Sequence, residues 1–101
     1  MTGTTTKARF SSVAVLSTPA ALEAFTRNHQ APFPFLQRHF SGDWGELCEE
    51  DRQANEQALM DGSRILSAYR LDDGTKIWII TEAADERGRR EATTTLLPSD
   101  Y

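Results

Sequence analysis

The stretch SRILSAYRLDDGTKIWIITE, residues 63–82, contains two runs of residues that alternate in character, with a turn sequence between them. One face of the two runs together consists of Ile65, Ser67, Tyr69, Leu71, Ile77, Ile79 and Thr81. A repeat of two residues predicts β-strands, because successive side chains of a strand point to opposite faces. Asp73 and Gly74 lie between the runs and favour a tight turn, because both residue types tolerate positive φ. We therefore predict a β-hairpin.

A third strand is expected in EATTTLLP (91–98), where Pro98 would end it. The segment before it, AADERGRRE (83–91), is polar and longer than a tight turn, so we expect a mobile loop there. Three strands joined in this order form an antiparallel meander. The uncharged, partly β-branched stretch FSSVAVLS (10–17) is a candidate for a fourth strand.

Helices are expected between these strands. Thr18 is a good N-cap and Pro19 a good first residue for a helix that ends within residues 28–32. The expected buried stripe of this helix is Ala21, Leu22 and Phe25. A short helix begun by Pro34 is expected in PFPFLQRHF (32–40). Its expected core residues are Phe35, Leu36 and Phe40.

The stretch SGDWGELCEEDRQANE (41–56) combines many acidic residues with a tryptophan between two glycines. Asp43 and Glu46 resemble a capping box in which Asp replaces Ser or Thr, so a helix is expected to begin there. The acidic residues of its first two turns would complement the helix dipole. Its expected buried stripe is Leu47, Ala54 and Ala58. Gly62 can adopt the left-handed conformation that ends helices, and the two glycines near Trp44 would let the chain turn sharply.

Together these elements predict an α+β fold. We expect a three- to four-stranded antiparallel sheet, formed by the C-terminal meander, with two or three helices from the N-terminal half packed on one face. A chain of 101 residues is long enough for one core without metals or disulfides. Residues 10–101 are therefore predicted to form a single domain, preceded by a disordered tail at residues 1–9.

Composition excludes several classes of protein. The net charge of −4 makes nucleic acid an unlikely partner, because phosphate binding relies on clustered Lys and Arg. Cys48, the single cysteine, cannot form an internal disulfide, so a reducing, cytoplasmic compartment is expected. No apolar run is long enough to cross a membrane, and the N-terminus lacks the features of a signal peptide.

The acidic cluster invites a comparison with metal sites. Its members are Glu46, Glu49, Glu50 and Asp51. No histidine or further carboxylate is placed by the sequence to complete a ligand shell, so we expect neither a metal nor another cofactor. The cluster is expected to be a solvated face that complements the helix dipole, or a surface that a protein partner recognises.

A thiol nucleophile is a weaker interpretation. Cys48 would need His29 or His39 within hydrogen-bond distance and a third group to orient the imidazole. Cys48 lies beside apolar positions and resembles a small core residue. We therefore assign no catalytic residue, while an enzyme that uses Asp43, Glu46 and a histidine as acid–base groups is kept as an alternative.

The two tryptophans are the strongest candidates for an interface. Trp78 and Ile80 alternate with the core residues of the hairpin, so they would form an exposed apolar patch with Leu66 if helices cover only the other face. Dimerisation across this face of the sheet is the alternative that would cover the patch. The candidate interface residues are Trp44, Glu46, Glu49, Glu50, Trp78 and Ile80.

A small basic loop is formed by Arg87, Arg89 and Arg90 around Gly88. It favours a second alternative, a nucleic-acid-associated regulator that contacts phosphate through these arginines.

Several motifs resemble a family of small bacterial proteins encoded on plasmids and other mobile elements. The motifs are GDWG, CEED, LSAY, DGTKIWIITE and the closing LLPSDY. The link that contains DERGRRE is longer than in that family. The resemblance implies no catalytic residues and no cofactor. It implies an accessory factor that binds a host or element protein, with counter-defence of the anti-restriction or anti-CRISPR type as one form. The expected function is thus non-enzymatic protein binding.

Overall fold

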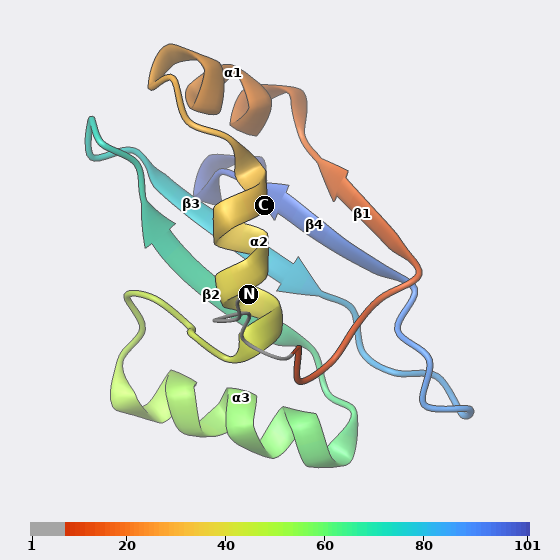
Figure 1. Ribbon diagram of the computed structural model, residues 1–101. Helices are drawn as coiled ribbons and strands as arrows, with labels where there is room; N and C mark the ends of the chain where they lie inside the picture. Colours follow the sequence, from red (N-terminus) through yellow and green to blue (C-terminus); the bar gives the residue numbers. More distant parts are fainter. Residues whose placement is uncertain (1–7) are drawn as a thin grey trace, which may run out of the picture.

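The computed structural model describes residues 8–101. Its elements, in chain order, are β1 (Ala14–Ser17), α1 (Pro19–Arg27), α2 (Pro32–Ser41), α3 (Glu49–Asp61), β2 (Ile65–Arg70), β3 (Lys76–Thr81), β4 (Ala92–Leu96) and the 3-10 turn η1 (Pro98–Asp100). The α+β class is confirmed, with the three helices preceding the meander (Figure 1).

The four strands form one sheet in the order β1-β4-β3-β2. The meander is antiparallel as predicted, with Ala68 opposite Trp78 and Ile80 opposite Thr94. The strand β1 is parallel to β4, with Val15 beside Thr93, so the complete sheet is mixed. This direction follows from the topology. The helices carry the chain from β1 to β2 at the far edge of the sheet. The strands β2, β3 and β4 then alternate in direction, which places β4 beside β1 and parallel to it.

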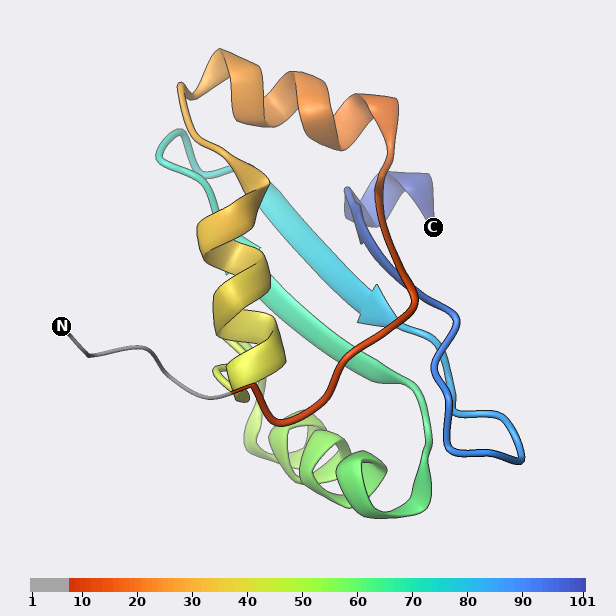
Figure 2. The same ribbon diagram turned by 45° about the vertical axis from the view of Figure 1, so that its right-hand side comes forward.

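The helices lie on one side of the sheet. The helix α2 crosses over this face, while α1 and α3 lie toward its two ends (Figures 1 and 2). The alternation predicted for the hairpin is confirmed, because all seven residues of the predicted inner face are buried. The main core cluster consists of Ala24, Phe25, Phe35, Leu36, Tyr69, Leu71, Ile77 and Ile79.

The helix α1 is capped as predicted, since the Ala21 N–H donates to Thr18 Oγ1 at 3.2 Å. The prediction for Leu22 is wrong, because this side chain is 47% exposed. The buried stripe is instead Ala21, Ala24 and Phe25, at the i, i+3 and i+4 spacing of one helix face. The helix α2 begins at Pro32, two residues before the predicted start, because Ala31 already has extended backbone before the first proline.

The predicted capping box is wrong. The helix α3 begins at Glu49, and Asp43 lies in a turn, where its Oδ1 accepts from the Gly45 N–H. Residues 44–46 run beside β2 instead of entering the helix, with Gly45 bridged to Ala68. A Cβ on Gly45 would lie 2.0 Å from the Ala68 carbonyl oxygen, so this close approach requires glycine.

The buried stripe predicted for α3 is only partly correct. Ala58 is buried and Ala54 is exposed, while the polar Asn55 is buried against β2. The predicted C-terminal role of Gly62 is confirmed, with φ +82° and its N–H donating to the Ala58 carbonyl.

The link between β3 and β4, predicted to be a mobile loop, contains a hydrogen-bonded turn. Ala84 and Arg90 form a bridge, and the Asp85 carboxylate accepts from two backbone N–H groups, those of Arg87 and Arg89. Positions 1–7 of the predicted N-terminal tail lie outside the described residues. Within the described part, Arg9 is anchored, since its N–H donates to the Phe40 carbonyl and its guanidinium pairs with Glu56.

Across residues 8–101, no helix combines the length and apolar character that a membrane crossing needs.

Candidate protein interface

The outer edge of β2 is closed by the chain itself. The Ala68 N–H donates to the Trp44 carbonyl, and the Glu46 N–H donates to the Ala68 carbonyl. The Asn55 side chain completes the edge, since its Nδ2 donates to the Leu66 carbonyl at 2.6 Å and its Oδ1 accepts from the Leu66 N–H at 3.2 Å. These contacts satisfy the outward backbone groups of Leu66 and Ala68, which an edge strand otherwise presents for pairing.

The opposite edge is formed by β1 and is open. The N–H groups of Ala14 and Thr18 donate to carbonyls in and beside β4, so the even-numbered residues of β1 bond inward. Just before the strand, the Val13 N–H also bonds inward, to the Arg90 carbonyl. The N–H and C=O of Val15 and Ser17 therefore point away from the sheet. Figure 1 shows β1 as the outermost strand on that side.

The β1 edge is also apolar and uncharged. The side chains of Val13, Val15 and Leu16 are each about half exposed, and no ionisable side chain occurs from Phe10 to Leu22. Proteins usually protect an edge strand with charged residues, proline or a bulge. The stretch Ala14–Ser17 has neither charge nor proline.

A groove of about 900 Å³ lies between the segment that leads into β1 and the helix α2. Its lining residues are Ala8, Phe10, Ser11, Ser12, Val15, Phe33, Pro34, Leu36, Gln37, Arg38, Phe40 and Ser41. The Phe33 ring at the start of α2 is 65% exposed, so this helix presents a large aromatic surface beside β1. Both walls come from residues 8–41. The sequence-based interface prediction contains no residue before Trp44.

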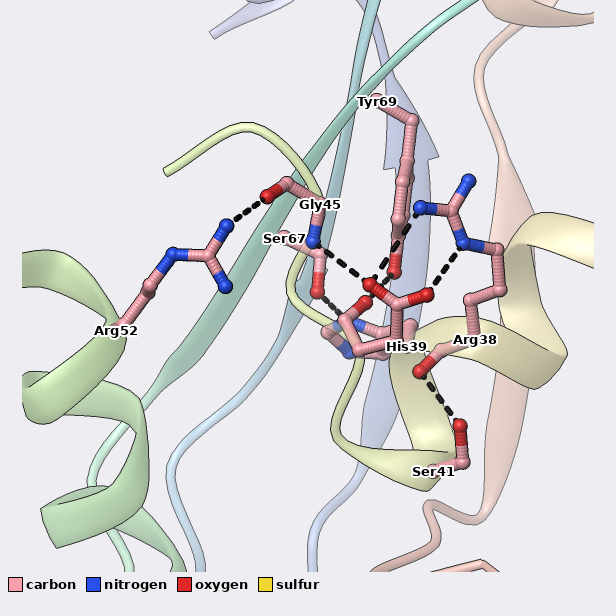
Figure 3. Close-up of polar contacts among 8 residues, drawn as sticks. Arg38, His39, Ser41, Gly45, Arg52, Ser67 and Tyr69 are labelled. Carbon is pink, nitrogen blue, oxygen red and sulfur yellow. Dashed lines mark hydrogen bonds and ion pairs between the residues drawn. The ribbon is translucent and has the colours of Figure 1, made fainter. Parts of the chain in front are cut away.

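Arg38 is the one ionisable side chain of this lining. Its guanidinium pairs with Asp43 at 2.8 Å and lies 4.6 Å from the centroid of the Tyr69 ring (Figure 3). The hydrogen bond from Arg38 lowers the pKa of Asp43 and the same contact raises the pKa of Arg38. The groove is thus lined mainly by apolar side chains, with a few uncharged polar ones, and its one cation is engaged in an ion pair.

A buried chain of hydroxyl groups lies beneath the groove. His39 points from α2 into the sheet, where Nδ1 lies 2.5 Å from Ser67 Oγ (Figure 3). Its Nε2 lies 2.8 Å from Thr81 Oγ1. The chain continues from Thr81 to Thr93 at 2.7 Å and from Thr93 to Ser12 at 2.8 Å. It connects β2, β3, β4 and the segment before β1.

The direction of this chain follows from its last bond. Ser12 Oγ donates to the Ala14 carbonyl, which can only accept, and a hydroxyl has one hydrogen. Thr93 must then donate to Ser12, Thr81 to Thr93, and His39 Nε2–H to Thr81. The Nδ1 atom of His39 consequently accepts from Ser67, which assigns the neutral Nε2–H tautomer. Burial lowers the pKa of His39 to about 3.

The Ser67–His39 contact has the distance of a nucleophile and its base, but both side chains are fully buried. Phe10 packs edge-on against the imidazole at 5.1 Å between ring centroids. A substrate has no path to this hydroxyl, so the pair acts as part of the core.

The predicted interface residues do not form one surface. Trp44 is 2% exposed and packs with Ala58 and Ile65, so its assignment to an interface is wrong; its Nε1 donates to Glu56 at 3.0 Å. Its burial follows from the pairing of residues 44–46 with β2, which directs the indole under α3.

The predicted patch on the other face of the sheet is only partly exposed. Ile80 is 7% exposed, so it is not a free apolar anchor. Trp78 is half-buried, and its ring lies 5.9 Å from that of Tyr101, which the C-terminal turn brings over this face. Glu49 and Glu50 are exposed at the start of α3, and Glu46 pairs with Arg70 at 3.1 Å.

The candidates for catalysis and metal binding are separated. Cys48 is exposed at the N-cap of α3, which corrects its assignment as a core residue, whereas His39 is in the core. Asp43 and Glu46 point to two different arginines in exposed ion pairs. Residues 8–101 contain no group of three or more His, Cys, Asp or Glu side chains that could hold a metal ion.

Arg90 is buried, which its place in the predicted basic loop did not indicate. It is 8% exposed, and its guanidinium donates to three carbonyls, those of Ala58, Ser63 and Glu82. It thereby joins the end of α3 to the hairpin. Only Arg87 and Arg89 of the basic cluster are exposed.

Searches of protein-family models, of curated proteins and of solved structures found no match to this chain.

Proposed function

We propose that this protein is a non-enzymatic binding module that holds an apolar segment of another protein in the groove between β1 and α2. The observation that carries the proposal is the combination of an exposed Phe33 with a groove of about 900 Å³ whose opposite wall includes Val15 of β1. An aromatic side chain beside a concave apolar surface is the usual anchor of a protein interface.

The distribution of exposed apolar side chains supports this surface. Among the described residues, seven large apolar side chains are strongly exposed, and five of them lie between residues 13 and 33. These five are Val13, Val15, Leu16, Leu22 and Phe33. Val15 and Phe33 line the groove, which favours this surface. Leu16 is paired with Thr94, which lies opposite Ile80, so Leu16 points to the Trp78 face of the sheet.

Arg38 gives the partner segment a preferred chemistry. It is the one ionisable residue that lines the groove, and its charge is already paired with Asp43. Arg38 would therefore favour a neutral hydrogen-bond acceptor of the segment over an amine. The resemblance noted above would place such a partner among host or element proteins, and counter-defence remains one form of the proposed function.

The test is a selection of displayed random peptides on the immobilised protein, followed by affinity measurements on the enriched sequences. We expect apolar peptides to be enriched. When they bind, the NMR chemical shifts of the protein's backbone amides should change in β1 and at the start of α2. Phe33→Ser should weaken them about tenfold or more, since losing an anchor costs at least about 1.4 kcal/mol. Met60→Ser is the matched control, because Met60 is 83% exposed on α3, away from the groove.

The proposal is wrong if no sequence is enriched, or if enriched peptides bind the Phe33→Ser and Met60→Ser variants equally well. Shift changes confined to Trp78 and its neighbours would move the function to the opposite face of the sheet.

A further inference from the structure

The two edges of the sheet are treated in opposite ways. The β2 edge is closed by residues 44–46 and by the Asn55 side chain, whereas the backbone groups of Val15 and Ser17 on β1 face outward. We propose that a second copy of this chain occupies the open edge, with β1 paired antiparallel to β1 across a two-fold axis at Val15.

The register of this pairing is self-complementary. With the axis at Val15, the outward N–H and C=O of each Val15 bond to those of the other copy. Leu16 of each copy then lies opposite Ala14 of the other, which pairs a large side chain with a small one on the same face. Val13 lies opposite Ser17, but its N–H already donates to the Arg90 carbonyl, so the ladder ends at this pair. An isologous contact of this kind closes on itself and gives a dimer.

Charge favours a second copy at this edge. Two chains of net charge −4 repel each other, and contact is least costly where neither presents a charge. Residues 10–22 contain no ionisable side chain, so the paired strands themselves place no like charges opposite each other. The nearest carboxylate is that of Asp100, which accepts from Thr18 Oγ1 at 2.7 Å just beyond the end of β1. The acidic start of α3, with Glu49, Glu50 and Asp51, belongs to the helix that contacts β2 at the far edge of the sheet.

The dimer would also enlarge the proposed binding groove. Residues opposite each other in an antiparallel pair point to the same face, so α2 of both copies would lie on one side of a continuous sheet. Val15 lines the groove of each copy, and the two grooves would therefore adjoin at the axis. This consequence rests on the proposed function, whereas the pairing itself does not.

The experiment is sedimentation velocity of the full chain without peptide, from low micromolar to near millimolar concentration. Wild type should show a concentration-dependent doubling of mass. Val15→Pro removes only an outward N–H and leaves the inward bonds to β4, so it should raise the dissociation constant at least tenfold. Val15→Thr keeps the N–H and a β-branched side chain, and should dimerise like wild type.

Leu16→Lys and Leu22→Lys form a second matched pair. Both residues are about half exposed, but only Leu16 lies on β1. Leu16→Lys would place a cation on the paired edge and should give a monomer, whereas Leu22→Lys should not change the dimer. If Val15→Pro fails to fold by circular dichroism, this pair decides the question.

A wild-type chain that stays monomeric at the highest concentration would overturn the proposal. So would a dimer that persists in both Val15→Pro and Leu16→Lys, because its interface would then lie elsewhere, such as the Trp78 face. Peptide binding by a strict monomer would leave the proposed function intact while removing the dimer, so the two failures are distinguishable.

Discussion

The Nε2–H of His39 donates to Thr81 Oγ1 at a distance of 2.8 Å, inside a core from which water is excluded. This bond ties the helix α2 to the middle of the sheet. It also fixes the neutral tautomer of the imidazole, because the hydroxyl chain beyond Thr81 runs in one direction to the Ala14 carbonyl.

The stability of the protein should therefore fall in mild acid through His39. The imidazole has a pKa of about 3 in the folded protein and about 6.5 in the unfolded chain, so the unfolded state binds the proton first as the pH falls. The contribution is fully present above pH ~6.5 and is lost between there and pH ~3, by up to ~1.4 kcal/mol per pH unit. Denaturant titrations at several pH values across this range give the free energy of unfolding at each pH. This free energy should depend less steeply on pH for His39→Gln than for wild type. Equal slopes would contradict the assignment.

The hydrogen bonds by which Asn55 closes the β2 edge should contribute more to the free energy of unfolding than an ordinary surface contact does. Asn55→Ala leaves a part-buried N–H and C=O of Leu66 without partners, so we expect a loss of about 1–3 kcal/mol in the free energy of unfolding. Gln53→Ala on the exposed side of the same helix should change it by less than about 0.5 kcal/mol. Denaturant unfolding of the two variants provides the comparison, and equal values would refute a role for Asn55 in closing the edge.

Substitutions of the three arginines in the β3–β4 link should differ sharply in their effect on the stability of the protein. Arg90→Met removes the donors of three carbonyls and should cost about 2–4 kcal/mol, since the cation itself lies in a mostly buried position. Arg87→Ala and Arg89→Ala remove exposed side chains and should stay within about 0.5 kcal/mol of wild type. Thermal unfolding of the three variants gives the ranking. A large loss for either exposed arginine would indicate a different role for this link.

Gly45 should tolerate no side chain. Gly45→Ala would place Cβ at 2.0 Å from the Ala68 carbonyl oxygen, so the bridge to β2 must break and Trp44 must move. Gly74 also has positive φ but has nothing within 4 Å of a Cβ, so Gly74→Ala measures the backbone cost alone, about 1 kcal/mol. The difference between the two variants in denaturant titrations isolates the clash, and similar losses would show that residues 44–46 can leave β2.

Local rules were sufficient where one segment decides its own structure. Alternation in residues 65–71 and 76–81 identified both the hairpin and its inner face, and Thr18 with Pro19 identified the start of α1. These features depend on side-chain direction and on backbone groups only a few residues apart. The uncharged run from Phe10 to Leu22 was also visible in the sequence, and it was the available signal for the open edge.

Contacts between distant segments decided the rest. Asp43 and Glu46 satisfy a capping pattern, but the pairing of residues 44–46 with Ala68 holds them outside the helix and buries Trp44. His39, Asn55 and Arg90 look like surface residues in the sequence and become core residues because the fold supplies hydrogen-bond partners for each of them. The sequence by itself determined the elements and the faces of the hairpin. Only the tertiary structure decided which polar groups are buried and which sheet edge stays open, because both depend on partners brought together from far along the chain.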